Sequence, residues 1–128
     1  MLVQLIIAAL FLASCCIDVS AWQRLSAKDA SNKVGVANLD IDFVVSSSSD
    51  QHDSNGVVYL DSQSDAQHQD NLRLCLSANA IAQLQERGII NPANSLLGKH
   101  LHIAGAVMRI QGQAMLPIQS ADQITIVS

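Results

Sequence analysis

The stretch "GKHLHIAGAVMRIQGQAMLPI", from Gly98 to Ile118, carries the clearest strand pattern of the sequence. In its first half, apolar side chains alternate with a second set of positions that includes both histidines. Alternation with period two is typical of a half-buried β-strand. The chain then turns at Gln111 and Gly112 and returns from Ala114 to Ile118, which predicts a hairpin. The apolar positions on the buried side of the first strand are Leu101, Ile103 and Val107.

Three further strands and one helix are predicted before this hairpin. The strands cover residues 36–45, 57–61 and 71–76, and in the first of them Leu39, Ile41, Phe43 and Val45 alternate with polar positions. Ser77 is a suitable cap for a helix over residues 78–88. A last strand is predicted over residues 123–127, and Gly105 marks a bend or bulge in the strand that contains the histidines. The polar residues 46–56 predict an exposed loop between the first two strands.

This order of elements is that of the OB-fold. We therefore predict a mainly β domain, a five-to-six-stranded Greek-key barrel with one α-helix between its third and fourth strands. A parallel βαβ architecture is disfavoured because only one convincing helix accompanies several strands.

Several short motifs extend this prediction to a family. Residues 34–127 resemble small exported bacterial OB-fold domains of the nucleic-acid-binding, anticodon-binding-like superfamily. The motifs shared with that group are Gly98-Lys99, the series Leu101, Ile103, Gly105 and Val107, the turn at Gly112, and Asp122-Gln123-Ile124. The resemblance implies an OB barrel that binds nucleic acid.

The N-terminal residues predict an export signal. Residues 1–13 are apolar and uncharged, and they are too few to span a bilayer comfortably. Small residues before Trp22 favour cleavage after Ala21, whereas Leu12 to Cys15 resemble a lipobox that would lipidate Cys15. We expect a signal over residues 1–21, a linker or short helical lead-in over 22–34, and the OB domain over 35–128. The mature protein would be periplasmic or secreted, and only the signal or a lipid on Cys15 would contact a membrane.

The charge of the chain limits the partners it can hold. The chain has 7 basic and 11 acidic side chains and a net charge of −4. Cleavage after Ala21 removes only Asp18, which leaves 7 basic and 10 acidic side chains and a charge of −3. This acidic balance argues against a protein that is held to nucleic acid by charge alone. Cys75 would be the only cysteine left after that cleavage, which excludes an internal disulfide.

A small set of side chains could still hold single-stranded nucleic acid. OB-folds stack bases on aromatic rings and contact phosphates with Lys and Arg, mainly on the second and third strands. The candidates on that face are Tyr59 and Arg73, with Lys99 and Arg109 at its periphery. The alternative function is that of a module outside the cytoplasm, which binds an envelope or secreted protein or a glycan through the barrel face and the loop 46–56.

The two histidines of the opening stretch raise the question of a metal site. In an OB barrel the fourth strand pairs with the first, so His100 and His102 would face the outward residues Asp40 and Asp42. Imidazoles and carboxylates are zinc ligands. Alternate histidines on an exposed strand are more often solvated or paired across strands. We therefore predict no metal and no cofactor. If the protein did bind a metal ion, these four side chains would be the candidate ligands.

No enzymatic role is expected. Ser46 to Ser49 and the neighbouring His52, Asp50 and Asp53 supply the residue types of a catalytic triad. A triad is defined by rigid geometry and an oxyanion hole, and a polar loop predicts neither.

Overall fold

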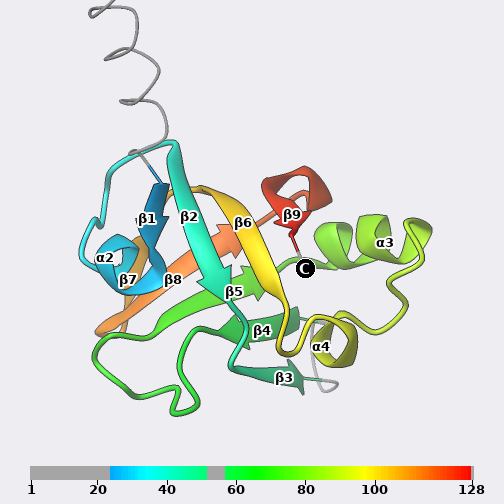
Figure 1. Cartoon of the computed structure of the whole chain (residues 1–128), viewed down its shortest axis with the longest axis horizontal. Helices are drawn as coiled ribbons and strands as arrows, with labels where there is room; N and C mark the ends of the chain where they lie inside the picture. Colours follow the sequence, from blue (N-terminus) through cyan, green and yellow to red (C-terminus); the bar gives the residue numbers. More distant parts are fainter. Residues whose placement is uncertain (1–23, 52–56, 128) are drawn as a thin grey trace, which may run out of the picture.

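Two β-sheets make up most of the protein in a computed structural model that describes residues 24–51 and 57–127 (Figure 1). One sheet has the order β1-β2-β6-β9 and the other β3-β4-β5-β8-β7. The mainly β prediction is confirmed. The strands are β1 (Arg24–Ser26), β2 (Leu39–Val44), β3 (Ser47–Gln51), β4 (Val57–Asp61), β5 (Leu72–Leu76), β6 (His100–Gly105), β7 (Met108–Ile110), β8 (Gln113–Ile118) and β9 (Ile124–Ile126). The helices are α2 (Ala27–Ser31), α3 (Ala78–Glu86), α4 (Pro92–Ser95) and the 3₁₀ helix η1 (Ala121–Gln123).

The predicted leader, its two processing sites and Trp22 lie outside the described residues. Export and lipidation therefore stay predictions. Among residues 24–51 and 57–127, no helix is long and apolar enough to cross a membrane.

The pairing of β2 with β6 confirms the expected contact between the first and fourth predicted strands. The two strands are antiparallel, with Asp42 opposite His102 and Val44 opposite His100. They are also the two inner strands of the four-stranded sheet. In the other sheet, β5 pairs in parallel with β8 and antiparallel with β4.

The two sheets differ from the single closed barrel that the sequence predicts. The first predicted strand ends at Val44 and the chain re-enters a strand at Ser47, now in the other sheet. Consecutive amides show the change, because Val45 donates to the carbonyl of Lys99 while Ser46 donates to that of Asp61. The fourth predicted strand divides in the same way into β6 and β7. The described residues thus form two sheets joined at two corners, whose strands cross in Figure 1.

The core lies between the sheets and confirms the predicted alternation. Ile41 and Phe43 on β2, and Leu101 and Ile103 on β6, are fully buried. The five-stranded sheet adds the apolar side chains on its inner side, namely Val58, Leu60, Leu72, Leu74, Leu76, Leu116 and Ile118.

The serine-rich segment forms a strand where the sequence predicts a loop. Residues 47–51 pair antiparallel with β4. The hydroxyl of Ser47 donates to the carbonyl of Gln63, and that of Ser48 donates to the carbonyl of Ala93. These partners are far away in the sequence, so local composition gives no sign of them. The rest of the predicted loop, residues 52–56, lies outside the described residues.

The local predictions for the helix and the hairpin are confirmed. Ser77 caps α3 by accepting a hydrogen bond from the amide of Ala80. Gln111 and Gly112 both have positive φ, 52° and 78°, as a tight two-residue hairpin turn requires. The expected helical lead-in contains α2 and also β1, which pairs with β2.

Replacement of Gly105 by alanine is expected to destabilise the protein by about 1–3 kcal/mol, the usual cost of overpacking. An added Cβ would lie 2.9 Å from the Cδ2 atom of Leu116 and 3.1 Å from the Nε2 atom of Gln123. Leu116 is fully buried, so its side chain would have to shift within the core. Urea denaturation followed by circular dichroism measures the loss. The control Ala104→Ser, at the exposed neighbouring position, should change stability by less than about 0.5 kcal/mol, and equal effects of the two changes would contradict this explanation.

Candidate functional site

Tyr59 and Arg73, two of the predicted binding residues, lie together on the five-stranded sheet. They project from the neighbouring strands β4 and β5, and both side chains are partly buried. The guanidinium carbon of Arg73 lies 4.7 Å from the centroid of the Tyr59 ring. A cation at this distance over a ring is attracted by its π face. The sequence therefore placed these two residues correctly on one face of the sheet.

Arg73 is held in place by a buried carboxylate that the sequence analysis missed. Its Nε atom lies 2.8 Å from Oδ1 of Asp61 and its Nη2 atom 3.1 Å from Oδ2, which is a two-pronged ion pair. Asn71 donates a further hydrogen bond of 3.0 Å to the same Oδ1. The hydrogen bonds to Asp61 raise the pKa of the Arg73 guanidinium above its usual value. Arg73 is thus a fixed planar group whose charge is largely neutralised.

Cys75 lies on the same side of β5 as Arg73, opposite Tyr59. Its sulfur lies 3.7 Å from the sulfur of Met115. Burial raises the pKa of the thiol, and the nearby charge of Arg73 offsets only part of this effect. Cys75 is therefore a packing residue with little thiolate character.

A polar hollow of about 200 Å³ lies next to this face, between the loop 66–71 and the hairpin of β7 and β8. Arg109 lines the hollow and donates hydrogen bonds to the carbonyls of Gly112 and Ser31. The side chain of Gln113 donates to the carbonyl of Ala66 and so ties the hairpin to the loop. The amide side chains that line the hollow are those of Gln67, Gln69, Asn71, Gln111 and Gln113.

The hollow is connected to the Tyr59–Arg73 pair through two buried polar side chains, those of Asn71 and Asp61. Asn71 lines the hollow and stands two residues before Arg73, and it contacts the same carboxylate of Asp61. On the next strand, Met115 is opposite Arg73. We call the outward side of these strands the Tyr59–Arg73 face, comprising Tyr59, Arg73, Gln113 and Met115. Arg109 is opposite the buried Ala114, so its side chain leaves the other side of the sheet and reaches the hollow at the sheet edge.

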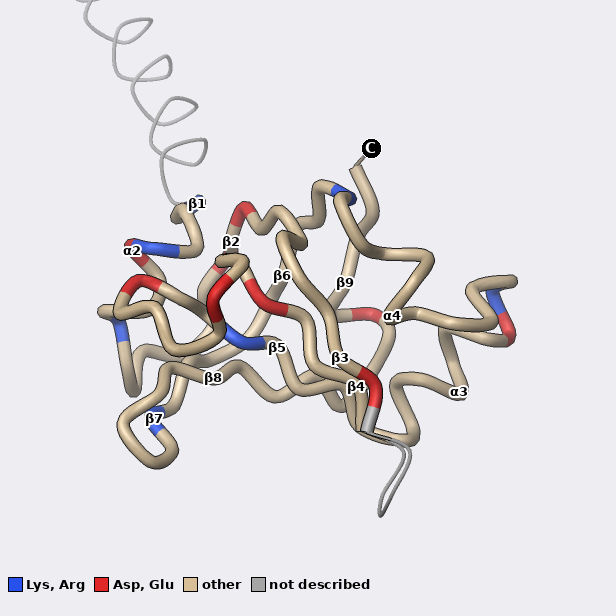
Figure 2. Tube along the Cα trace, turned by 90° about the horizontal axis from the view of Figure 1, so that it is seen from below, with Lys and Arg blue, Asp and Glu red and all other residues tan. Residues whose placement is uncertain are grey.

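Lys99, the fourth predicted binding residue, is exposed in the turn before β6. Among the described residues, no hydrogen bond or ion pair joins its side chain to the Tyr59–Arg73 face. Figure 2 shows Lys and Arg positions scattered among Asp and Glu positions over the described part of the chain. Much of this positive charge is paired, as in Arg24 with Asp40 and Arg87 with Asp122. Phosphate neutralisation can therefore contribute only a small part of any binding energy on this face.

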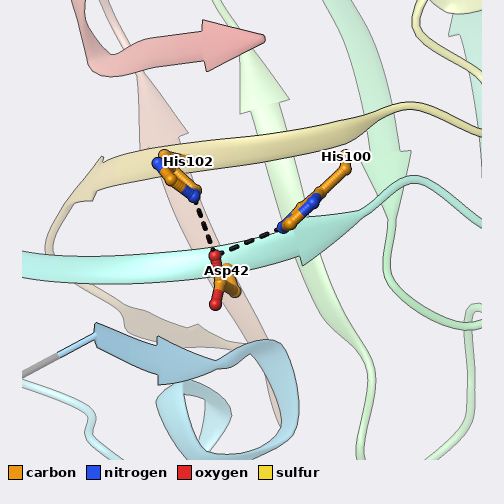
Figure 3. Close-up of side chains that lie close together, drawn as sticks. All are labelled: Asp42, His100 and His102. Atoms are coloured by element: carbon orange, nitrogen blue, oxygen red, sulfur yellow. Dashed lines mark hydrogen bonds and ion pairs between the residues drawn. The ribbon is translucent and has the colours of Figure 1, made fainter. Parts of the chain in front are cut away.

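Three of the four candidate metal ligands meet on the other sheet (Figure 3). Asp42 on β2 lies between His100 and His102 on β6. Its Oδ1 atom is 3.3 Å from the Nε2 atom of His100 and 3.0 Å from that of His102. The fourth candidate, Asp40, is opposite Ala104 and forms an ion pair with Arg24 at 3.4 Å. It is outside the group that the other three form.

The fold and these two surfaces define a mainly β domain with an aromatic and guanidinium pair on one sheet and a histidine pair on the other. Neither known protein families nor curated protein sequences give a match to the chain. The structure is similar to the crystal structure of a protein from Leishmania major Friedlin that is assigned as an aspartyl-tRNA synthetase, with a TM-score of 0.51 and 8% sequence identity. The similarity covers 82% of this chain and 20% of the synthetase chain. At this identity it concerns the fold alone.

Proposed function

We propose that the protein is a non-catalytic binding module of the OB type that holds single-stranded nucleic acid on the Tyr59–Arg73 face. The observation that carries the proposal is the stacked pair of Tyr59 and Arg73 on neighbouring strands, 4.7 Å apart. Nucleobases stack on aromatic rings and on guanidinium planes, and this stacking tolerates any sequence. The pair places an aromatic ring and a guanidinium plane side by side, so a base could stack on either group.

The connections between the two sheets support the OB assignment. The chain passes from one sheet to the other at Val45–Ser46 and again between Gly105 and Met108. The pairing of β2 with β6 and these two corners are what a partly open Greek-key barrel bent into two sheets would require, and they support the proposal. Helix α3 follows the third predicted strand, as the OB order requires.

The comparison with solved structures supports nucleic acid as the ligand class. The similar structure is assigned as a tRNA synthetase, so its own name connects it with nucleic acid. The family resemblance of residues 34–127 points in the same direction. In OB-folds the face of the second and third strands, with the adjoining loops, holds oligonucleotides. Tyr59 and Arg73 occupy these strands here.

The chemistry of the face suggests how a strand would be held. One base would stack against the fixed pair, where a single stacking contact is worth about 1–3 kcal/mol. The adjoining hollow presents amide donors and acceptors, which suit the edges of an unpaired base. Arg109 also lines the hollow, at the edge strand β7, and would be the cation that meets a phosphate bound there.

Fluorescence anisotropy with labelled single-stranded DNA and RNA tests this proposal on the full chain. Tyr59→Leu is expected to weaken binding by about 1–3 kcal/mol at any salt concentration, because it removes stacking. Arg109→Gln should weaken binding mainly at low salt and should reduce the salt slope by about one. Both measurements are made at about 50 mM and about 200 mM salt, where phosphate contacts differ strongly.

The matched control is Arg87→Gln, which removes an equal charge from the end of α3, where Arg87 pairs with Asp122. This variant should bind as the unsubstituted chain does. Equal losses in the Arg87 and Arg109 variants, with no loss in the Tyr59 variant, would mean that binding is general charge attraction, and the proposed face would be wrong. No binding at low salt would overturn nucleic acid as the ligand class and leave a protein or glycan partner.

A further inference from the structure

Asp42, His100 and His102 point their side chains toward one place above the four-stranded sheet (Figure 3). Each offers one metal-binding atom, and these three atoms lie within 4.8 Å of one another. Both imidazoles approach the carboxylate through the same ring atom, Nε2, at 3.0 and 3.3 Å. The arrangement is therefore a cluster of three donors rather than one histidine paired with one carboxylate.

The spacing of the donors is close to what a bound ion requires. Zinc bonds of about 2.0–2.1 Å in a tetrahedron place neighbouring donor atoms about 3.3 Å apart. The two distances from Asp42 Oδ1 agree with this separation. The two imidazole nitrogens lie within 4.8 Å of one another, so the rings would turn toward each other to bring these atoms to the same separation around one ion.

The backbone that holds these donors is well supported. β2 and β6 are the two inner strands of their sheet, and six residue pairs join them in register. On the opposite side of the same strands, Ile41, Phe43 and Ile103 are fully buried. The positions of the three Cα atoms are thus fixed by the core, and little order has to be gained when an ion binds.

The donors are also open to solvent. The side chains of His100, His102 and Asp42 are 37%, 26% and 47% exposed. His102 lines a groove of about 520 Å³ that extends along the sheet. An ion held by three protein atoms at such a place keeps at least one coordination position for water, as in zinc sites with three protein ligands.

We propose that Asp42, His100 and His102 form a binding site for a divalent transition-metal ion, with Zn²⁺ as the ion to test. Two imidazole nitrogens and one carboxylate suit zinc and its neighbours, whereas Mg²⁺ and Ca²⁺ prefer ligand sets made of oxygen. Without an ion, the two imidazoles share the Oδ1 atom of Asp42. To bind an ion through Nε2, each neutral imidazole carries its proton on Nδ1. This site is separate from the Tyr59–Arg73 face and does not depend on nucleic-acid binding.

Calorimetric titration of the full chain with ZnCl₂ tests the site. Cys15, Cys16 and Cys75 are replaced by serine throughout so that thiolates do not compete for the ion. We expect one ion per chain, and a loss of at least about tenfold in affinity for His102→Ala and for Asp42→Asn, because even changes next to metal ligands cost about 10–100-fold. MgCl₂ should give no heat beyond dilution.

The matched control is His68→Ala. His68 lies in the loop 66–71, where its Nδ1 atom accepts a hydrogen bond from the amide of Asp70. This variant should keep the full affinity for Zn²⁺. Unchanged affinity in His102→Ala and Asp42→Asn, or an equal loss in His68→Ala, would overturn the proposal.

NMR spectra of the imidazole rings provide a second test, in which all histidines and Asp42 are kept. This test does not depend on whether a variant without one of the ligands folds. Addition of Zn²⁺ should shift the ring signals of His100 and His102 together and leave those of His68 in place. Saturating Zn²⁺ without a shift at His100 and His102 would overturn the site.

Discussion

Asp61→Ala is expected to lower the free energy of unfolding by about 3 kcal/mol, because it leaves the Arg73 guanidinium without its partner. The Asp61 side chain is 4% exposed and that of Arg73 is 18% exposed. Three hydrogen bonds, two from Arg73 and one from Asn71, end on the lost carboxylate. Removal of one member of a buried pair costs about 3–5 kcal/mol, and the lower end applies because Arg73 can turn toward water. Urea denaturation followed by circular dichroism measures the change.

The control for Asp61 is Asp40→Ala, which removes a carboxylate from an exposed ion pair with Arg24. Exposed pairs contribute about 0–1 kcal/mol, so this variant should be nearly as stable as the unsubstituted chain. The double variant Asp61→Leu with Arg73→Met should recover most of the loss, since apolar residues can replace a buried pair at little cost. A loss for Asp61→Ala as small as that for Asp40→Ala would show that the pair is solvated.

The alternation of side chains gave a correct prediction of which face of each strand is buried. Ile41 and Phe43 on one strand and Leu101 and Ile103 on its neighbour all lie in the core. Such a pattern is local, because each residue's side of the strand follows from its position in the chain. The prediction that His100 and His102 would face Asp42 also depended on pairing the first strand with the fourth, and that pairing is observed.

The division of the strands into two sheets could not be predicted from the same pattern. Val45 is as buried as Phe43, so the alternation continues through the point where the chain changes sheets. The change becomes visible only in the hydrogen bonds of Val45 and Ser46, which end on Lys99 and Asp61. Neither acceptor is close in sequence. A bend that is encoded by distant partners leaves no local signal.

The contacts of the Tyr59–Arg73 face could be predicted only in part, because they too depend on residues far apart in the sequence. Tyr59 and Arg73 were placed on one face because their strands were predicted to be adjacent. The role of Asp61 was missed, since a single aspartate at the end of a strand resembles an ordinary turn residue. Its partners Asn71 and Arg73 are 10 and 12 residues away. The ion pair could have been predicted only from the pairing of β4 with β5, which places Asp61 opposite Arg73. The sequence alone does not give that register.

Phe43→Ala is expected to lower the free energy of unfolding by about 3–5 kcal/mol, the usual cost of removing a buried aromatic ring. Phe43 is fully buried and lies on β2, between β1 and β6. A domain of this size is stable by only about 5–15 kcal/mol, so the variant should lose a large part of its stability. Val44→Ala is the matched control, since Val44 is the next residue on the same strand and is 52% exposed. It should cost less than about 0.5 kcal/mol. Urea denaturation of both variants compares the two faces of one strand, and equal losses would mean that the alternation from Leu39 to Val45 does not define the core.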